Sequence, residues 1–214
     1  GISYIKAIKK NKLNIKPITI KRTSDYHSTT EDNNIISASN IRNKLKHKED
    51  ISNYVPRKTL KLIENISLED LFPFIKYKIL TDLDLSKYLT VDEGIENRLK
   101  EKILEAKTLD DFIMSIKTKR YTYNKISRML VHILISLPKE INKLANIEYI
   151  KILGFNKLGR NYLHELKDDL EISLVPIPNS LQYKYEILAS HVYSLISENK
   201  ILLFEKSNKP IFFE

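Results

Sequence analysis

A short run of hydroxyl, amide and arginine side chains is well suited to bind a charged ligand. Residues 36–42 read Ile-Ser-Ala-Ser-Asn-Ile-Arg, which places Ser37, Ser39 and Arg42 in one short segment. A serine-rich turn that opens a helix presents backbone N–H groups, hydroxyl donors and the positive helix end at one place. Arg42 could add a two-pronged contact, and the combination suits a phosphate group. The alternative is structural: Ser39 caps the helix and Arg42 is a surface cation.

A pair of cations, Lys21 and Arg22, follows a segment in which Ile18 and Ile20 alternate with polar residues. This alternation predicts a short strand. If the strand belongs to a nucleotide-binding sheet, its carboxyl end lies where a ligand would meet the serine turn. Arg22 could then clamp a phosphate or stack on a base, and the alternative is a strand-end cation in water.

The segment 117–128 contains no acidic residue and alternates cations with tyrosines. Its cations are Lys117, Lys119, Arg120, Lys125 and Arg128, and its tyrosines are Tyr121 and Tyr123. Tyrosine rings can stack on unpaired bases while cations hold phosphates, which indicates an RNA contact. On the helix expected after Thr122, Tyr123 would join a buried stripe, whereas Lys125, Arg128 and His132 would share another face. The alternative is that Tyr123 is only core and the cations are only solvated.

Two weaker patterns have simpler structural explanations. Glu93 and Glu96 could be acid and base groups, but carboxylates in the first turn of a helix also favour its dipole. Gly154 and Gly159 give a weak phosphate-loop signal between a strand and a helix, for which a plain turn is the alternative.

The composition limits the chemistry. The chain has 214 residues, no cysteine, and five histidines, at positions 27, 47, 132, 164 and 191. No disulfide, thiolate metal site or cysteine nucleophile is therefore expected, and the histidines show no paired ligand spacing, so we predict no metal site. No run approaches about 18 apolar residues, so we expect no membrane segment and a cytoplasmic protein.

The net charge of +9 is concentrated near the start of the chain. Residues 1–62 hold 14 Lys and Arg against 5 Asp and Glu, whereas residues 63–214 hold 22 of each kind. Together with the acid-free segment, this distribution predicts a polyanion that is contacted at two places. The alternative is a lysine-rich sequence bias with solvated faces.

The apolar spacing predicts a mainly helical chain with a minor α/β part. Helices are expected over 2–11, 39–48, 68–79, 95–103, 108–117, 123–136, 158–169 and 180–197, and strands over 18–20, 147–155 and 172–175. Residues 53–56 are the predicted link, with Pro56 at the first position of the next helix. The part after the link is expected to be mostly helical, with a small βαβ element near 147–176.

The serine turn resembles the I-S-S-T-x-I-R signature of the nucleotidylyltransferase superfamily, with Ala38 and Ser39 replacing its second serine and its threonine. Further segments resemble the tRNA(Met) cytidine acetate ligase family in the same order: 1–7, 19–22, 26–27, 94–99, 117–123 and 153–156. The resemblance covers essentially the whole chain. The family begins with a Rossmann half that carries a histidine motif, which has no match here. We therefore expect a C-terminal portion that lacks adenylating activity by itself.

The resemblance implies residues 1–52 of a Rossmann-like ATP-binding domain and a mostly helical tRNA-binding domain over 53–214. It implies that acetate and ATP give acetyl-adenylate and pyrophosphate, and that the acetyl group passes to N4 of the wobble cytidine of elongator tRNA(Met). The implied ATP contacts are Lys21, Arg22, Ser37, Ser39 and Arg42. The implied tRNA contacts are Lys117, Lys119, Arg120, Tyr121, Tyr123, Lys125 and Arg128. No catalytic residue is assigned, and a magnesium ion stays an open question.

Two other classes of protein fit parts of the pattern. One is a non-catalytic anticodon-binding helical module, as in an aminoacyl-tRNA synthetase, in which the serine turn would have no role. The other is a helical protein-interaction domain, which predicts no salt-dependent RNA binding. Separate measurements of ATP and tRNA(Met) binding distinguish these two classes from the ligase.

Overall fold

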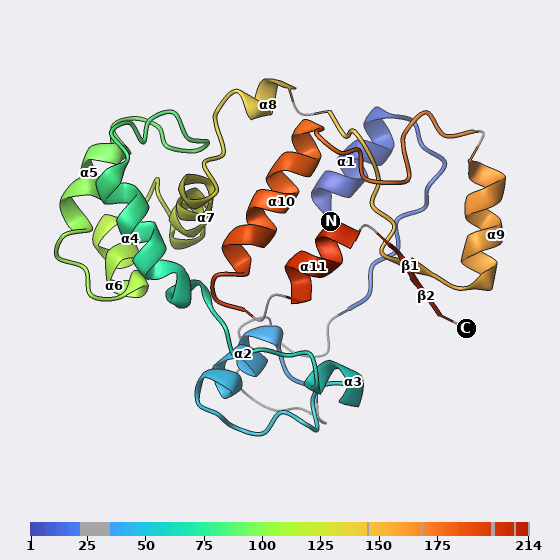
Figure 1. Cartoon of the computed structure of the whole chain (residues 1–214), viewed down its shortest axis with the longest axis horizontal. Helices are drawn as coiled ribbons and strands as arrows, with labels where there is room; N and C mark the ends of the chain where they lie inside the picture. The colour runs from blue at the N-terminus through green and yellow to red at the C-terminus, as the bar shows by residue number, and fades with distance from the viewer. Residues whose placement is uncertain (22–34, 145, 168, 198–199, 208, 214) are drawn as a thin grey trace. The chain divides into compact units, whose positions relative to one another are not determined.

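The computed structural model describes residues 1–21, 35–144, 146–167, 169–197, 200–207 and 209–213 (Figure 1). The chain forms two compact units, Gly1–Asn65 and Ile66–Glu214. The division follows Asn65, whereas the sequence predicted a link at 53–56, and the roles assigned to the two parts stay predictions. Among the helices of these residues, none has both the length and the apolar character to cross a membrane.

In its described residues, the first unit contains the helices α1 (Ile2–Lys10), α2 (Ala38–Lys46) and α3 (Arg57–Leu60). The first two were predicted from their apolar spacing. Pro56 caps α3 instead of lying at its first position. Ile51 is the one buried hydrophobic side chain among the described residues of this unit, so the unit has almost no apolar core.

The predicted strand over 18–20 is wrong, because the structure has neither helix nor strand between residues 13 and 21. The alternation of Ile18 and Ile20 is correct for a strand, but a strand also needs a neighbour to complete its hydrogen bonds. No described backbone group pairs with these residues. Their apolar side chains stay exposed.

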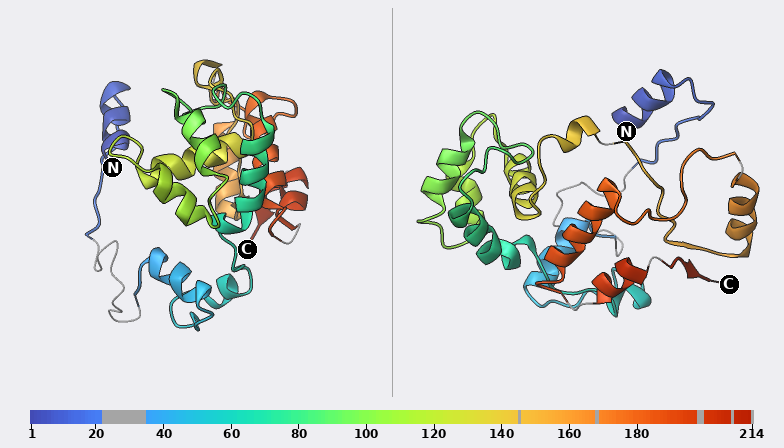
Figure 2. Two further views of the ribbon diagram at one scale, coloured as in Figure 1. Left: turned by 90° about the vertical axis from the view of Figure 1, so that its left-hand side faces the viewer. Right: turned by 45° about the horizontal axis from the view of Figure 1, so that its top comes forward.

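The second unit begins with a helical bundle. It contains η1 (Leu68–Leu71), α4 (Phe72–Thr81), α5 (Ile95–Lys102), α6 (Leu109–Ile116) and α7 (Tyr123–Leu134). Helix α4 packs against α7 and α5, and α6 packs against α5 and α7. Figure 2 shows these helices gathered together from two further sides. Their facing side chains form one continuous core that includes Ile75, Leu99, Phe112, Ile126 and Leu130.

Local signals set the starts of these helices. Ser67 and Asp70 form a capping box before the short 3-10 turn, and Pro73 lies in the first turn of α4, where its missing N–H costs little. The hydroxyl of Thr108 accepts a hydrogen bond from the Asp111 N–H at 3.1 Å and caps α6, as the sequence predicted. The Lys100 ammonium of α5 donates to the Leu83 carbonyl at 2.8 Å, a contact that joins α5 to the segment after α4.

The rest of the second unit contains α8 (Ile141–Leu144), α9 (Lys157–Leu166), α10 (Leu181–Tyr193), α11 (Lys200–Ser207) and two strands. The Tyr149 side chain is buried there, and its hydroxyl donates to the Glu186 carboxylate of α10 at 2.6 Å. Gln182 of α10 accepts from the Glu148 N–H at 3.1 Å. These contacts fix the segment before the first strand against α10. Val192 and Ile196 pack on the bundle core.

The predicted βαβ element near 147–176 does not form as expected. Strand β1 (Gly154–Phe155) pairs in parallel with β2 (Ile211–Phe212), and residues 172–175 contribute only a single parallel bridge, between Tyr149 and Ser173. A Cβ on Gly154 would lie 2.9 Å from the Ile211 carbonyl oxygen, so glycine permits this close approach. About half of the chain is helical in the described residues, with a small parallel sheet, so the expected mainly helical chain with a minor α/β part is confirmed only in outline. The partner of β1 lies much further along the chain than predicted.

Candidate functional site

The serine turn opens helix α2, and Ser37, not Ser39, is its cap. The Ser37 hydroxyl accepts from the Asn40 N–H at 3.1 Å, and both residues are buried. The prediction that Ser39 caps this helix is therefore wrong. The cap lies two residues earlier because the helix already includes Ala38 and Ser39. Capping uses Ser37 and leaves the hydroxyl of Ser39 for another contact.

Ser39 and Arg42 lie one turn apart on the exposed face of α2. Neither side chain has a hydrogen-bond or ion-pair partner among the described residues. No acidic residue lies in the first turn of the helix, so its positive end is not neutralised locally. The geometry offers a hydroxyl and a guanidinium beside a helix N-terminus, which is a chemically suitable place for a phosphate.

The remaining predicted ATP contacts precede this turn. Lys21 is exposed, and Arg22 lies outside the described residues. The structure therefore places three of the five predicted residues, Ser37, Ser39 and Arg42, in one turn. The grouping of all five stays a prediction.

The first half of the basic segment, residues 117–122, forms a tight turn between α6 and α7, and its second half begins α7. The Thr118 N–H donates to the Tyr121 carbonyl at 3.0 Å, and the Tyr121 N–H donates to the Thr118 hydroxyl at 3.0 Å. This reciprocal pair closes the turn and leaves Lys119 and Arg120 exposed at its tip. Thr122 then begins α7 without a side-chain cap hydrogen bond. Two cations therefore stand just before a helix N-terminus, where both attract phosphate.

Tyr121 lies in the core and is not open to a base. Its side chain is 7 % exposed, and its hydroxyl donates to the Asp92 carbonyl at 2.8 Å. The Lys125 ammonium lies 4.2 Å from the centre of its ring. Burial raises the pKa of the Tyr121 hydroxyl, with a smaller contribution from the Glu93 and Asp92 carboxylates. Tyr121 therefore positions the turn and Lys125, whereas stacking on RNA would require it to leave this place.

Tyr123 is more exposed than its predicted place in the buried stripe implies. Its side chain is 38 % exposed, whereas Ile126, Leu130 and Ile133 are fully buried as expected. A tyrosine in the first turn of α7 lies at the rim of the bundle, so one side of its ring faces solvent. Of the two tyrosines, Tyr123 is the one whose ring a base could reach.

Most of the cations in the basic segment are free of carboxylates. Within the described residues, Lys117, Lys119 and Arg128 form no ion pair, and Arg120 pairs with Glu93. Lys125 is half-buried against Tyr121, so the three free cations and Arg120 carry the exposed charge. The segment is thus positive overall, and among its described cations Arg120 is the one that is paired with a carboxylate, that of Glu93.

A strained acidic loop lies against the basic segment. Thr90, Glu93 and Gly94 all have positive φ angles, of 69°, 61° and 79°, and the loop carries Asp92 and Glu93. Such φ values are uncommon for residues other than glycine, and tertiary contacts must hold them. The Asp92 carboxylate pairs with Lys139 at 3.0 Å. The sequence offered Glu93 as an acid or base group or as part of a helix first turn, but Glu93 precedes α5 and pairs with Arg120, a contact that no local pattern signals.

His132 joins the same loop to α7. Its Nδ1 lies 3.1 Å from the Thr90 hydroxyl and 3.2 Å from the Leu89 carbonyl oxygen. Burial lowers the pKa of His132, and Arg128 lowers it further, against the opposing effect of the Leu89 carbonyl. The predicted stripe of Lys125, Arg128 and His132 is therefore not one solvated face. Of the three, Arg128 is exposed, whereas Lys125 and His132 are half-buried.

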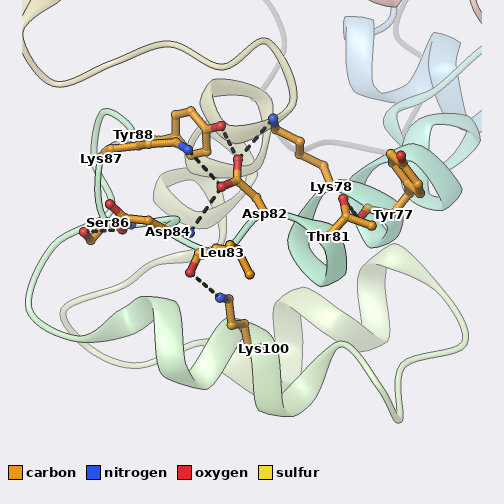
Figure 3. A network of polar contacts seen from close by, with 10 residues as sticks. All are labelled: Tyr77, Lys78, Thr81, Asp82, Leu83, Asp84, Ser86, Lys87, Tyr88 and Lys100. Carbon is orange, nitrogen blue, oxygen red and sulfur yellow. Dashed lines mark hydrogen bonds and ion pairs between the residues drawn. The ribbon is translucent and has the colours of Figure 1, made fainter.

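Figure 3 shows a network of polar contacts around Asp82, at the end of α4. Its carboxylate accepts from Lys87 at 2.9 Å, pairs with Lys78 at 3.2 Å and also accepts from the Tyr88 hydroxyl. Burial would raise the pKa of Asp82, but the hydrogen bonds from Tyr88, Lys87 and Lys78 outweigh it and hold the pKa far below its usual range. The two lysines and the tyrosine all direct their polar groups to the Asp82 carboxylate. We therefore interpret the network as structural and not as a second catalytic candidate.

The two other sequence candidates have structural roles. Asn156 caps α9 by accepting from the Gly159 N–H at 2.9 Å, so the 154–160 segment is a plain strand-to-helix turn. Glu96 lies in the first turn of α5, in agreement with the simpler alternative. Across the part of the chain that the structure describes, no three His, Asp or Glu side chains gather where they could hold a metal ion.

The chain matches known proteins along nearly its whole length. A family model described as HIGH Nucleotidyl Transferase matches residues 1–207. A tRNA(Met) cytidine acetate ligase from Geobacillus sp. (strain WCH70) is 38% identical over an alignment of 236 residues. This alignment covers 99% of this chain and 59% of that protein. A protein of the same name from Staphylococcus aureus (strain JH9) is 37% identical over 208 residues, covering 92% of this chain and 55% of the relative.

Two solved structures share the fold. The apo structure of Thermotoga maritima TmcAL has a TM-score of 0.83 and 22% identity, and it covers 99% of this chain and 59% of that protein. The structure of the same protein bound with alpha-thio ATP has a TM-score of 0.76 and 21% identity. The chain therefore spans a little over half the length of the relatives that it matches.

The resemblance to tRNA(Met) cytidine acetate ligases seen in the serine turn and the other segments is confirmed by these matches. The family model covers all the described elements except β2, including both candidate contact regions. The chain belongs to the HIGH nucleotidyl transferase family.

Proposed function

We propose that this chain contributes ATP and tRNA contacts to a ligase that acetylates a cytidine of elongator tRNA(Met). The observation that carries the tRNA part is the tip of the basic segment, where Lys119 and Arg120 are exposed just before the N-terminus of α7. The names of the relatives support the reaction class. The chain spans 59% of the length of the Geobacillus relative, so we propose the acetylation for the complete protein of which this chain forms a part.

The proposed reaction has two steps. An acetate oxygen attacks the α-phosphorus of ATP, and the bond between this phosphorus and the oxygen that bridges it to the β-phosphate breaks. Pyrophosphate departs, and acetyl-adenylate is formed. The cytidine N4 then attacks the acetyl carbonyl carbon, AMP leaves, and N4 loses a proton to give N4-acetylcytidine. Both steps concentrate negative charge on phosphate oxygens. Cations and N–H groups placed there lower the barrier electrostatically.

The first unit supplies the proposed ATP contacts. Ser39 and Arg42 would hold phosphate oxygens at the start of α2, with Ser37 fixing the helix end and Lys21 and Arg22 adding charge from the preceding segment. The exposure of Ser39 and Arg42 and their lack of described partners support this assignment. An ATP-analogue complex of the Thermotoga protein supports ATP as the nucleotide. A magnesium ion stays open.

The second unit supplies the proposed tRNA contacts. Lys117, Lys119, Arg120 and Arg128 would neutralise backbone phosphates, and Tyr123 would offer the exposed ring. Lys125 and Tyr121 would hold the turn from behind. The sequence predicted that both tyrosines contact the tRNA. In this proposal only Tyr123 does so, because Tyr121 is buried.

The test compares binding of elongator tRNA(Met) to the chain and to the variant Lys119→Ala with Arg120→Ala. We expect the variant to bind more weakly and its slope of log affinity against log salt to fall by roughly 0.7–0.9 for each lost phosphate contact. Lys206→Ala removes a cation from the exposed side of α11 and is the matched control. ATP binding, measured separately with a labelled nucleotide, should not change in either variant.

The outcomes separate the function classes. If the chain binds tRNA in a salt-dependent way but binds no ATP, it is better described as a non-catalytic tRNA-binding module. In that case Arg42→Ala should change neither binding property. If the Lys119 and Arg120 variant binds tRNA as well as the unchanged chain, the basic segment is not the contact, and this part of the proposal fails.

A further inference from the structure

Helix α9 carries a row of basic side chains that none of the roles above uses. Lys157, Arg160, His164 and Lys167 follow one another at intervals of three or four residues, from the start of the helix to its C-cap. Residues at this spacing are neighbours on a helix surface, about 5–6 Å apart. All four side chains are exposed. These four residues, the α9 row, form a continuous basic surface along the helix.

The charge of the α9 row is not neutralised by carboxylates. Among the described residues, none of its four side chains forms an ion pair or a hydrogen bond. Glu165 is the one acidic residue of α9, and it is three or four residues away from no member of the row, so it is not their neighbour on the helix surface. The first turn of α9 also contains no acidic residue. The row can therefore attract an anion from solution.

The packing of α9 within the second unit leaves the row open. The helix packs on β1 (Figure 1), and Gly159, Leu163 and Leu166 are half-buried. A Cβ on Gly159 would lie 3.3 Å from the Cβ of Phe155, so the glycine lets the helix approach the strand closely. Three members of the row each follow one of these half-buried residues by one position, which places them about 100° further round the helix. The apolar side thus fixes the helix, and the basic side stays exposed.

We infer that the α9 row is a second RNA-binding surface, which holds backbone phosphates of the tRNA in addition to the contacts of segment 117–128. The inference rests on the proposed tRNA binding. The Arg160 guanidinium can hold a phosphate through two parallel hydrogen bonds, and the two lysines add point charges. Asn161, exposed and within four residues of both Lys157 and His164, adds an amide donor. Phosphate contacts carry no base information, so this surface contributes affinity and orientation and not the choice of base.

The same features favour RNA over an anionic membrane. A basic helix that lies on a membrane must bury its apolar side in the lipid. In α9 that side is half-buried within the protein, and the apolar side chains left exposed are Leu158 and Tyr162, at 77% and 60%. Binding to RNA phosphates requires only the basic row, which is completely exposed.

The experiment compares binding of elongator tRNA(Met) to the 214-residue chain and to the variant Lys157→Ala with Arg160→Ala. Two lost phosphate contacts should remove roughly 1.4–1.8 from the slope of log affinity against log salt. Between about 50 and about 200 mM salt, the affinity of the variant should therefore fall about tenfold less than that of the unchanged chain. The matched control, Leu158→Gln with Tyr162→Gln, changes exposed side chains of the same helix without removing a charge and should bind like the unchanged chain.

A protection measurement on the unchanged chain gives a second readout that needs no variant. Bound tRNA should slow the reaction of the Lys157 and Lys167 amines with a biotinylation reagent, measured by mass spectrometry, and should leave Lys206 of α11 reactive. An unchanged salt slope in the double alanine variant, or equal reactivity of both α9 lysines with and without tRNA, would overturn the inference. An equal loss of affinity in the glutamine control would also overturn it, because the fold of α9 and not its charge would then be required.

The result also shows which proposal fails. If Lys119→Ala with Arg120→Ala weakens tRNA binding but the α9 variant does not, the proposed function stands and the α9 row is not a contact. If the unchanged chain binds no tRNA, both proposals fail. If Lys157 and Arg160 are needed for binding to phosphatidylserine vesicles and not for binding to tRNA, the row is a lipid contact and the inference is wrong.

Discussion

Arg120 and Glu93 form an ion pair at the tip of the basic segment, and this pair sets how much positive charge the segment offers. Both side chains are more than two-fifths exposed, so solvent screens their attraction. A phosphate of an RNA can therefore displace the carboxylate at small cost. Glu93 competes with the proposed ligand without preventing its binding.

Glu93→Gln should strengthen tRNA binding. An exposed pair of this kind is worth about 0–1 kcal/mol, so the gain in affinity is expected to be up to about fivefold at low salt and to vanish at high salt. The measurement is tRNA affinity over a range of salt concentrations. Glu96→Gln, on α5 close by but without an ion pair among the described residues, is the matched control. Equal gains in both variants would point to net charge and not to the Arg120 pair.

At the scale of elements, helix α2 shows how a shift of two residues in the position of the cap changes a function assignment. Ser37 caps the helix, and Ser39 lies exposed within its first turn. The same two serines therefore divide the two roles that the sequence left as alternatives. Capping belongs to Ser37, and phosphate binding is proposed for Ser39.

Ser37→Ala should weaken α2 by about 1 kcal/mol, whereas Ser39→Ala should leave its stability almost unchanged. Amide exchange of the α2 backbone measures this directly. ATP affinity should show the opposite order, with the larger loss in Ser39→Ala. A loss of α2 protection in Ser39→Ala that equals the loss in Ser37→Ala would restore the original placement of the cap.

The Asp82 network fixes the end of α4 and makes a prediction for pH. The pKa of Asp82 is lowered in the folded protein, so its contribution to stability is present above the unfolded pKa near 3.8 and is lost as the pH falls below it. Asp82→Asn should lower stability by about 1–3 kcal/mol at neutral pH and much less at pH values below the unfolded pKa. Thermal unfolding at both ends of this range checks it. Asp110→Asn is the control, and an equal pH dependence in both variants would contradict the assignment.

At the scale of the whole molecule, stability is distributed unevenly between the two units. Among the described residues, the buried hydrophobic cluster that runs from Leu71 to Ile133 lies in the second unit. The first unit lacks a comparable core among its described residues. Among the described residues, apolar burial is therefore concentrated in the second unit.

A polypeptide of residues 66–214 should therefore fold alone. We expect cooperative thermal unfolding by circular dichroism at nearly the same midpoint as the complete chain, together with retained tRNA affinity. Residues 1–65 alone should show no cooperative transition. A cooperative transition in residues 1–65, or a collapse of 66–214, would show that the two units depend on each other for stability.

The sequence by itself determined most of the helices and the family. Helices depend on contacts within a few residues, so the apolar spacing of Ile95, Leu99 and Ile103 and the cap at Thr108 were readable locally. The ordered segments around the serine turn and residues 117–123 identified the family, and the comparisons confirm it. The candidate residues were also found in this way, although only their types and spacing could be argued.

Only the tertiary structure decided which residues meet across the chain. The pairing of Gly154 with Ile211, the contact of Arg120 with Glu93 and the burial of Tyr121 each join residues that are distant in sequence. A strand needs a partner, and a side chain is buried only when another element covers it, so no local pattern specifies either outcome. Residues 18–20 illustrate the same point, because they have the side-chain alternation of a strand but pair with no other described segment.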